Sequence, residues 1–423
     1  MTDQFAYHEG VLHAEEVNLI DLARSVGTPF YCYSERAMRE RMTTLRDALA
    51  FIDPLIAYAM KANSNQAILT LLGHLGAGAD VVSLGELERA ISARIPPSRI
   101  VFSGVGKTEI EMHRALELGI HAFNIESEPE LERLNLIAAE MGRIAPVSVR
   151  INPNVDAKTH AKISTGKSEN KFGIPFERAL EVYAEIAAAS HLNAIGVDMH
   201  IGSQITDLEP FENAFALLAE LVTSLRAAGH TIDHVDIGGG LGIIYEPLSH
   251  RPDILAYAAL VNKHIAPLGC KLIVEPGRWL VGNAGIVVTR VNYVKQGATH
   301  PFVIVDAGMN DLLRPTLYEA YHEIQPVIEP DPDTQTIVAD VVGPICESGD
   351  YLALGREIGP VAQGDLLAVK SAGAYGAVMA GTYNSRPLIP EVLVSGDRHH
   401  VIRARQQLTD LIGLDDVPDW LDQ

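Results

Sequence analysis

The chain has 423 residues, a length that predicts more than one domain. Hydrophobic residues make up 47% and charged residues 21%, which is ordinary for a globular protein. Its 33 Lys and Arg against 54 Asp and Glu give a net charge of -21, which argues against nucleic acid and anionic membranes as partners. Three scattered cysteines fit no zinc spacing, so we expect no metal. With no signal-like N-terminus and no apolar run of membrane-spanning length, we expect a cytoplasmic protein.

Residues 1–34 predict a strand near Gly10, a short helix at 17–25 and a strand at 29–33. After them, short apolar β-branched runs alternate with longer helical segments, the pattern of a parallel sheet. Eight such strands are expected, at 55–60, 79–83, 100–103, 122–125, 146–152, 194–201, 234–237 and 271–274. Eight successive units predict an α/β fold with a (β/α)8 barrel.

Polar or glycine residues follow most of these strands, and in a barrel the carboxyl ends of the strands share one mouth. The polar segment 154–172 follows the fifth strand. It is either a lid over that mouth or an exposed insertion.

Beyond Arg278 the pattern changes to strands separated by turns, at 286–295, 302–305, 336–342, 365–369, 391–394 and 400–403. These predict an all-β domain. We therefore expect a barrel domain at 35–278 and a β-sandwich or β-barrel-like domain formed by 1–34 and 279–423.

Lys61 ends the apolar run AYAM and is followed by small polar residues. A lysine at the mouth of a barrel strand can form a Schiff base with an aldehyde cofactor, although a surface lysine at a strand end fits the octapeptide equally well. Other segments favour the cofactor. The strand at 234–237 runs into Gly238, Gly239 and Gly240, a loop that suits a phosphate, with a tight turn as the alternative.

Glu275 and Arg278 end the eighth strand in the segment EPGR. A glutamate beside a pyridine nitrogen would keep that nitrogen protonated. His200 and Ser203 leave the sixth strand, where an imidazole could cover a flat cofactor and a hydroxyl could donate to phosphate. The alternatives are an ion pair at a domain junction and a buried structural histidine.

Cys346 lies between a Gly-Pro turn and acidic residues, a setting that suits a proton donor, with an inert buried cysteine as the alternative. Arg314 and Arg278 are the arginines expected to recognise a carboxylate. A surface salt bridge is the alternative for Arg314.

Taken together, seven segments resemble those of the diaminopimelate decarboxylases, pyridoxal-phosphate enzymes with an alanine-racemase-like fold. They are AYAMKAN, HIGSQ, DIGGGLG, EPGR, LLRPTLY, GPICESGD and AGAYG. The resemblance implies conversion of meso-2,6-diaminopimelate to L-lysine and carbon dioxide, the last step of lysine biosynthesis.

The resemblance also implies a role for each matching residue. Lys61 would carry pyridoxal 5'-phosphate, Glu275 would meet its ring nitrogen and Cys346 would donate the proton. The other cofactor contacts would be His200, Ser203, Gly238, Gly239, Gly240, Pro276, Gly277, Arg278 and Tyr375. The substrate contacts would be Arg278, Arg314, Tyr318, Glu347 and Tyr375.

In this family the active site is shared across a homodimer, with the cysteine segment supplied by the partner. A sister decarboxylase acting on ornithine, arginine or carboxynorspermidine is the nearest alternative, because EPGR serves phosphate binding in those relatives. A racemase is disfavoured, because it would need an acid-base residue on each face of the substrate and no second-face base is evident. The presence of both Lys61 and Cys346 argues against a non-catalytic regulator.

Overall fold

The computed structural model describes residues 4–157, 159–163, 165–166, 170–247 and 252–421. Its contacts divide the chain into two compact units. Residues 39–244 and 250–280 form the first, here called the barrel unit, and residues 1–38, 245–249 and 281–423 form the second, here called the β unit. In the described part of the chain, every helix is too short or too polar to cross a membrane.

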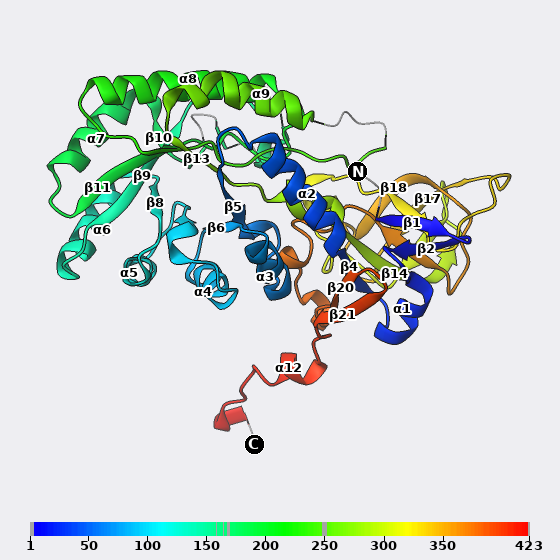
Figure 1. Ribbon diagram of the computed structural model, residues 1–423. Coiled ribbons are helices and arrows are strands. Elements are labelled where there is room, and N and C mark those ends of the chain that lie inside the picture. Colours follow the sequence, from blue (N-terminus) through cyan, green and yellow to red (C-terminus); the bar gives the residue numbers. More distant parts are fainter. Residues whose placement is uncertain (1–3, 158, 164, 167–169, 248–251, 422–423) are drawn as a thin grey trace. The chain divides into compact units, whose positions relative to one another are not determined.

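Eight parallel strands close into a barrel, as the alternation of strand and helix patterns predicts (Figure 1). In order around the ring they are β5 (Leu55–Ala59), β6 (Gly78–Val81), β7 (Ile100–Phe102), β8 (Ala122–Ile125), β9 (Ala145–Asn152), β11 (Leu192–Asp198), β12 (His234–Asp236) and β13 (Lys271–Val274). Pairing of β13 with β5 completes the ring. The short strand β10 (Ile174–Pro175) adds to β9 from outside it.

Helices lie outside the strands, and most of them are preceded by a residue whose side chain caps the helix N-terminus. They are α2 (Glu35–Ala48), α3 (Gln66–His74), α4 (Leu84–Ser92), α5 (Glu109–Leu118), α6 (Glu128–Glu140), α7 (Ala179–Ala188), α8 (Glu209–Ala227) and α9 (Ile254–His264). Thr108 and Glu111 form a reciprocal capping box at α5, and Ser83 caps α4. These caps fix where each strand-to-helix loop ends.

The barrel interior is packed with small and medium apolar side chains at its lower level. Ala57, Val101, Ala122 and Ile273 are each no more than 1% exposed and form one cluster. This layer closes the barrel beneath the polar residues of its mouth, as in other eight-stranded barrels.

The N-terminal segment belongs to the β unit, as its position before the repeating pattern predicts. It forms β1 (Phe5–His8), β2 (Val11–Ala14), β3 (Val17–Asn18), α1 (Leu19–Val26) and β4 (Phe30–Ser34). Strand β4 lies between β14 (Gly285–Lys295) and β20 (Glu391–Ser395). The β sheet is therefore built from both ends of the chain.

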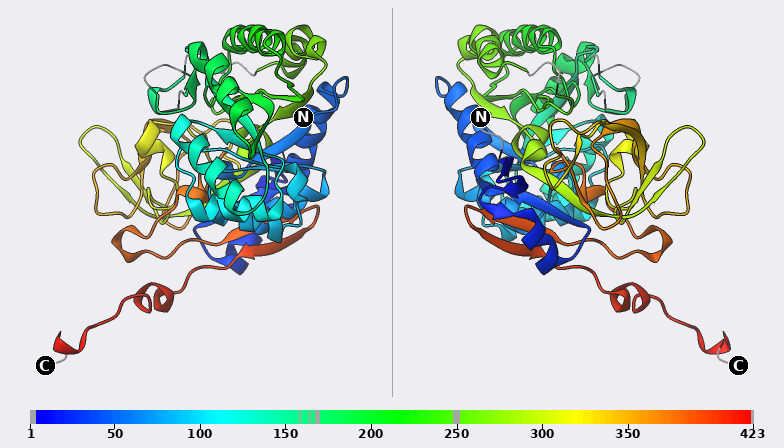
Figure 2. Two further views of the ribbon diagram at one scale, coloured as in Figure 1. Left: turned by 90° about the vertical axis from the view of Figure 1, so that its left-hand side faces the viewer. Right: turned by 90° about the vertical axis from the view of Figure 1, so that its right-hand side faces the viewer.

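The remaining strands of the sheet are β15 (Phe302–Val305), β16 (Ile324–Pro326), β17 (Ile337–Val342), β18 (Tyr351–Ile358), β19 (Leu366–Val369) and β21 (Arg398–Arg403). The sequence did not predict β16 and β18. Strand β16 is three residues long and ends in proline, while β18 contains Gly355, and both features obscure a strand pattern. Beyond β21, a segment with the short helix α12 (Leu408–Ile412) leads away from the strands of its own unit in all views (Figures 1 and 2).

Gly78 gives a test of barrel packing, because a Cβ at this position of β6 would collide with the carbonyl oxygen of Arg99. We expect Gly78→Ala to lower the free energy of unfolding by about 1–3 kcal/mol, as overpacking against backbone does. Urea unfolding followed by circular dichroism measures this change. Gly106→Ala is the matched control, since no atom lies within 4 Å of its Cβ position. Equal losses in the two variants would contradict the close packing at β6.

Candidate active site

Lys61 lies directly after β5, in the short helix η1 (Met60–Ala62) rather than on the strand itself. Its Nζ is 2.6 Å from Oδ2 of Asp80. Asp80 belongs to the neighbouring strand β6 and is fully buried, whereas the Lys61 side chain is 35% exposed. A buried carboxylate thus holds the lysine at the barrel mouth, and the lysine side chain remains partly exposed.

Three more buried carboxyls meet at the ends of β11, β12 and β13. Ligand oxygens of Asp198, Asp236 and Glu275 lie within 4.8 Å of one another, the one such group that could hold a metal ion among the described residues. Burial raises the pKa of all three, and their mutual repulsion raises the pKa of Asp198 and Glu275 further. Burial and the charge of Asp80 bring the pKa of Asp236 to about 7, against a hydrogen bond from Gly238.

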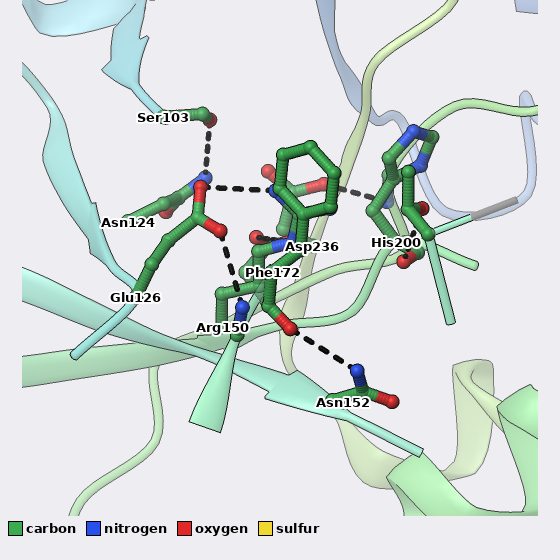
Figure 3. A network of polar contacts seen from close by, with 12 residues as sticks. Ser103, Asn124, Glu126, Arg150, Asn152, Phe172, His200 and Asp236 are labelled. Atoms are coloured by element: carbon green, nitrogen blue, oxygen red, sulfur yellow. Dashed lines mark hydrogen bonds and ion pairs between the residues drawn. The ribbon is translucent and has the colours of Figure 1, made fainter. Parts of the chain in front are cut away.

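A network around Arg150 of β9 borders this cluster (Figure 3). Arg150 Nη1 donates to Glu126 at 3.0 Å, and its Nε lies 4.0 Å from Asp198. The guanidinium also stacks on Phe172, 4.9 Å from the ring centroid. Asn152 Nδ2 donates to the Phe172 carbonyl at 3.1 Å. The end of the segment 154–172 is therefore fastened to β9.

The same segment also contacts the loop after β11. Thr165 Oγ1 donates to the carbonyl of His200 at 3.1 Å, and Ser203 N–H donates to that of Ile163 at 3.1 Å. Residues 158, 164 and 167–169, which belong to the predicted lid, lie outside the described residues. The described part of the segment rests on the barrel mouth.

His200 contacts the glycine loop that follows β12. Gly239 N–H donates to His200 Nδ1 at 3.2 Å, so the proton of the neutral ring lies on Nε2. Burial, followed by the charges of Arg150 and Lys61, holds the pKa of His200 well below its ordinary value. The imidazole is therefore uncharged near neutral pH.

The loop leaves no room for a side chain at Gly238, Gly239 or Gly240. A Cβ on Gly239 would collide with the carbonyl oxygen of Glu275, and one on Gly240, where φ is +100°, would lie 2.7 Å from the Gly202 oxygen. Such close backbone approach is typical of loops that present N–H groups to an anion.

The EPGR segment joins the glycine loop to the lysine turn. Glu275 N–H donates to the Gly238 carbonyl at 2.8 Å, and Ala59 N–H donates to that of Pro276 at 3.2 Å. A Cβ on Gly277 would lie 3.1 Å from that of Ala62. Arg278, which is buried, donates from Nη2 to Ser203 Oγ at 3.1 Å. The structure thus brings together all the candidate residues from the barrel unit.

The other candidates lie in the β unit, where two of their segments are in contact. Arg314 and Tyr318 are the ends of α11 (Arg314–Tyr318), and Thr316 between them donates to the Gly349 carbonyl at 2.6 Å. That carbonyl belongs to the loop GPICESGD, in which Cys346 and Glu347 are exposed. Cys346 is thus not the inert buried thiol considered as an alternative, unlike Cys32 and Cys270.

Tyr375 has φ of +55°, in the left-handed region that a bulky residue rarely adopts. Asn384 and Ser385, in the short helix η8 (Tyr383–Ser385), share this conformation. Asn384 Oδ1 accepts the backbone N–H of Cys346 at 2.8 Å. Backbone strain of this kind persists where the surroundings impose it, and it is common at functional sites.

Asp198 and Asp236 were not predicted as members of the site. A weak signal was present: each acid lies two residues before a predicted site residue, His200 and Gly238, at the end of an otherwise apolar strand. The pattern cannot show that both carboxyls point into the barrel.

Residues 35–282 match the protein family described as "Pyridoxal-dependent decarboxylase, pyridoxal binding domain". The chain is 49% identical over 421 residues to diaminopimelate decarboxylase of Zymomonas mobilis, covering 99% of each. It is similar to the structure of diaminopimelate decarboxylase from Helicobacter pylori complexed with L-lysine, with a TM-score of 0.90, 43% identity and coverage of 94% and 99%. For the enzyme from M. jannaschii in co-complex with L-lysine, the TM-score is 0.94, with 38% identity and 99% coverage of both chains.

The raised pKa of Asp236 predicts how stability depends on pH. Folding favours the protonated carboxyl, so its contribution is complete below the ordinary pKa of 3.8 and is lost as the pH rises toward about 7. For the cofactor-free protein, we expect Asp236→Asn to raise the melting temperature at pH 8 and to change it little near pH 4. Thermal scans across this range measure the difference.

Asp233→Asn, at an exposed position just before the same strand, is the control and should leave the pH dependence unchanged. A melting temperature for Asp236→Asn that falls below that of the parent at pH 8 would show that the carboxylate is stabilising.

Proposed function

This chain belongs to the family of pyridoxal-dependent decarboxylases. Because its relatives in this family include diaminopimelate decarboxylases, we propose that it converts meso-2,6-diaminopimelate to L-lysine and carbon dioxide. The observation that carries this proposal is the 49% identity, over 99% of both chains, to a relative named diaminopimelate decarboxylase. The reaction would complete lysine biosynthesis.

The barrel mouth fits pyridoxal phosphate, which, when bound, supplies an aldehyde for an amine and a ring that accepts electrons from the breaking carbon–carbon bond. Lys61 would hold the aldehyde carbon, and Glu275 would face the ring nitrogen. The buried carboxyls support this fit, because they suit a cationic ring and because Asp80 Oδ1 and Asp198 Oδ1 lack hydrogen-bond partners among the described residues. His200, uncharged, would lie against the ring.

The phosphate would lie at the glycine loop. Gly239 and Gly240 admit the close backbone approach that an anion requires, and the Ser203 hydroxyl lies beside the buried guanidinium of Arg278. The residues we assign to this side of the cofactor are Ser203, Gly238, Gly239, Gly240, Pro276, Gly277 and Arg278. Arg278 is also a candidate for the substrate carboxylate.

Residues of the β unit are assigned to the substrate. Arg314 would bind the carboxylate that is retained, Glu347 the ammonium beside it, and Cys346 would give a proton to the carbon that loses carbon dioxide. Tyr318 and Tyr375 complete the set. Each matches the expected chemistry, since a guanidinium fork suits a carboxylate and an accessible thiol can donate a proton.

Carbon dioxide release tests this function across diaminopimelate, ornithine, arginine and lysine. We expect diaminopimelate to be the preferred substrate. Arg314→Ala should lower kcat/KM for it roughly 100-fold or more, because the carboxylate would lose a charged partner in a buried setting. Arg398→Ala, at an exposed position of β21, is the control. Faster turnover of ornithine or arginine than of diaminopimelate would replace this function with that of a sister decarboxylase.

We further propose that the active enzyme is a homodimer in which Cys346 serves the Lys61 of the partner. The exposure of Cys346 and Glu347 supports this arrangement, because a second copy could then reach them. Lys61→Ala and Cys346→Ala would each be nearly inactive alone.

Mixing these two variants after mild dissociation tests the shared site. Random reassociation should restore about a quarter of parental activity, since half of the dimers would contain one intact site. Each variant mixed with itself is the control. If every site is built from one chain, the mixture stays inactive.

We also propose that the cofactor domain spans residues 35–278 and that residues 1–34 and 279–423 form the β domain. We further propose that the protein is cytoplasmic. The three free cysteines agree with a reducing compartment.

A further inference from the structure

A buried cluster in the β unit surrounds Arg314. The guanidinium carbon lies 4.4 Å from the centroid of the Tyr245 ring, and Arg314 Nη1 is 2.7 Å from His322 Nε2. The rings of Tyr245 and His322 meet edge to face, with centroids 5.3 Å apart and an interplanar angle of 79°. Arg314 is 5% exposed and His322 is fully buried.

The protonation of His322 follows from its two partners. Its Nδ1 lies 2.8 Å from the carbonyl oxygen of Lys370, which can only accept, so Nδ1 carries the hydrogen. Arginine has no lone pair to offer, so Nε2 must be the acceptor from Nη1. His322 is therefore a neutral imidazole that directs one edge of the guanidinium.

The backbone also holds His322 in place. It lies two residues before β16, whose Ile324 pairs with Val369 of β19, and Lys370 follows that strand. Arg356 Nη1 donates to the His322 carbonyl at 2.6 Å, while the Arg356 guanidinium lies 3.7 Å from the Tyr321 ring centroid. Arg356 thus holds the backbone of His322, and the carbonyl of Lys370 holds its imidazole.

We propose that His322, together with Tyr245, positions Arg314 for the carboxylate that the substrate retains, an inference that rests on the proposed function. A long arginine side chain loses much conformational freedom on binding unless it is held beforehand. His322 orients the fork through an uncharged acceptor, so this hydrogen bond adds no negative charge that would compete with the carboxylate of a ligand. Tyr245 covers one face of the guanidinium and limits its rotation.

The chemistry of the ligands provides a selective readout. Diaminopimelate and L-lysine both carry the retained carboxylate, whereas pentane-1,5-diamine has the same amines without it. A defect in positioning Arg314 should weaken the first two and spare the third.

His322→Asn and His322→Gln separate the two hydrogen bonds of the imidazole. Asparagine can reproduce the Nδ1 donor to Lys370 but cannot reach Arg314, whereas glutamine can place an acceptor near the Nε2 position. With the holoenzyme, we expect His322→Asn to raise KM for diaminopimelate and the dissociation constant of L-lysine roughly 10-fold. We expect kcat and the affinity for pentane-1,5-diamine to change little, and His322→Gln to restore most of the lysine affinity. Calorimetric titration gives the affinities independently of turnover.

A double variant shows whether the effect passes through Arg314. In the Arg314→Ala background, His322→Asn should cause no further loss of lysine affinity. Tyr245→Leu, at a half-buried position, provides a second route if His322→Asn folds poorly, and it should show the same selective loss. An equal loss for pentane-1,5-diamine, or a full effect without Arg314, would overturn the proposal.

The two proposals fail in different ways. If the parent enzyme releases no carbon dioxide from diaminopimelate, the proposed function fails. If the parent enzyme is active but His322→Asn and Tyr245→Leu bind L-lysine as the parent does, only the positioning role fails.

Discussion

The site depends on an excess of buried carboxyls at the barrel mouth. Asp80, Glu126, Asp198, Asp236 and Glu275 are each at most 4% exposed, and they face Lys61 and Arg150. Two carboxylates about 4 Å apart repel by roughly 4 kcal/mol at an effective dielectric constant of 20. The cluster therefore retains protons, as the raised pKa values of Asp198, Asp236 and Glu275 indicate, or accepts an external cation. The protonated pyridine ring of the cofactor that we propose for this site would be such a cation.

Closure of the barrel brings these charges together, although they lie far apart in the sequence. Parallel strands end at one rim, so Asp80, Asp198 and Asp236, from strands far apart in the sequence, converge there. The apolar layer around Ala57 and Val101 closes the space below them. Glycines then let neighbouring loops approach the rim, because a side chain on Gly239 would collide with the Glu275 backbone. Packing and charge thus act at the same end of the barrel.

Much of this arrangement could be predicted from the sequence, because strand periodicity and strand-end residues are local signals. The strands before Lys61, Gly238 and Glu275 were predicted with ends within a residue or two, and β4 was correctly grouped with the C-terminal strands. Strand β16 was missed, because three residues ending in Pro326 have no period. His322 was missed for a different reason: a single histidine outside any motif becomes informative only through long-range partners such as Lys370. The direction in which Asp198 and Asp236 point depends on barrel closure, which no local pattern records.

The two buried arginines Arg150 and Arg314 differ in the groups to which they donate hydrogen bonds. Arg150 donates to the carboxylate of Glu126 and lies near that of Asp198, so its charge is largely neutralised and it serves to hold the acids and Phe172 in place. Arg314 Nη1 instead donates to the neutral Nε2 of His322, and a ring face of Tyr245 covers the guanidinium. An acid in place of His322 could also accept from the guanidinium, but its charge would compete with the carboxylate of an arriving ligand. A neutral acceptor therefore fixes the guanidinium without adding a competing negative charge, and this would suit the proposed selection between ligands that differ by one carboxylate.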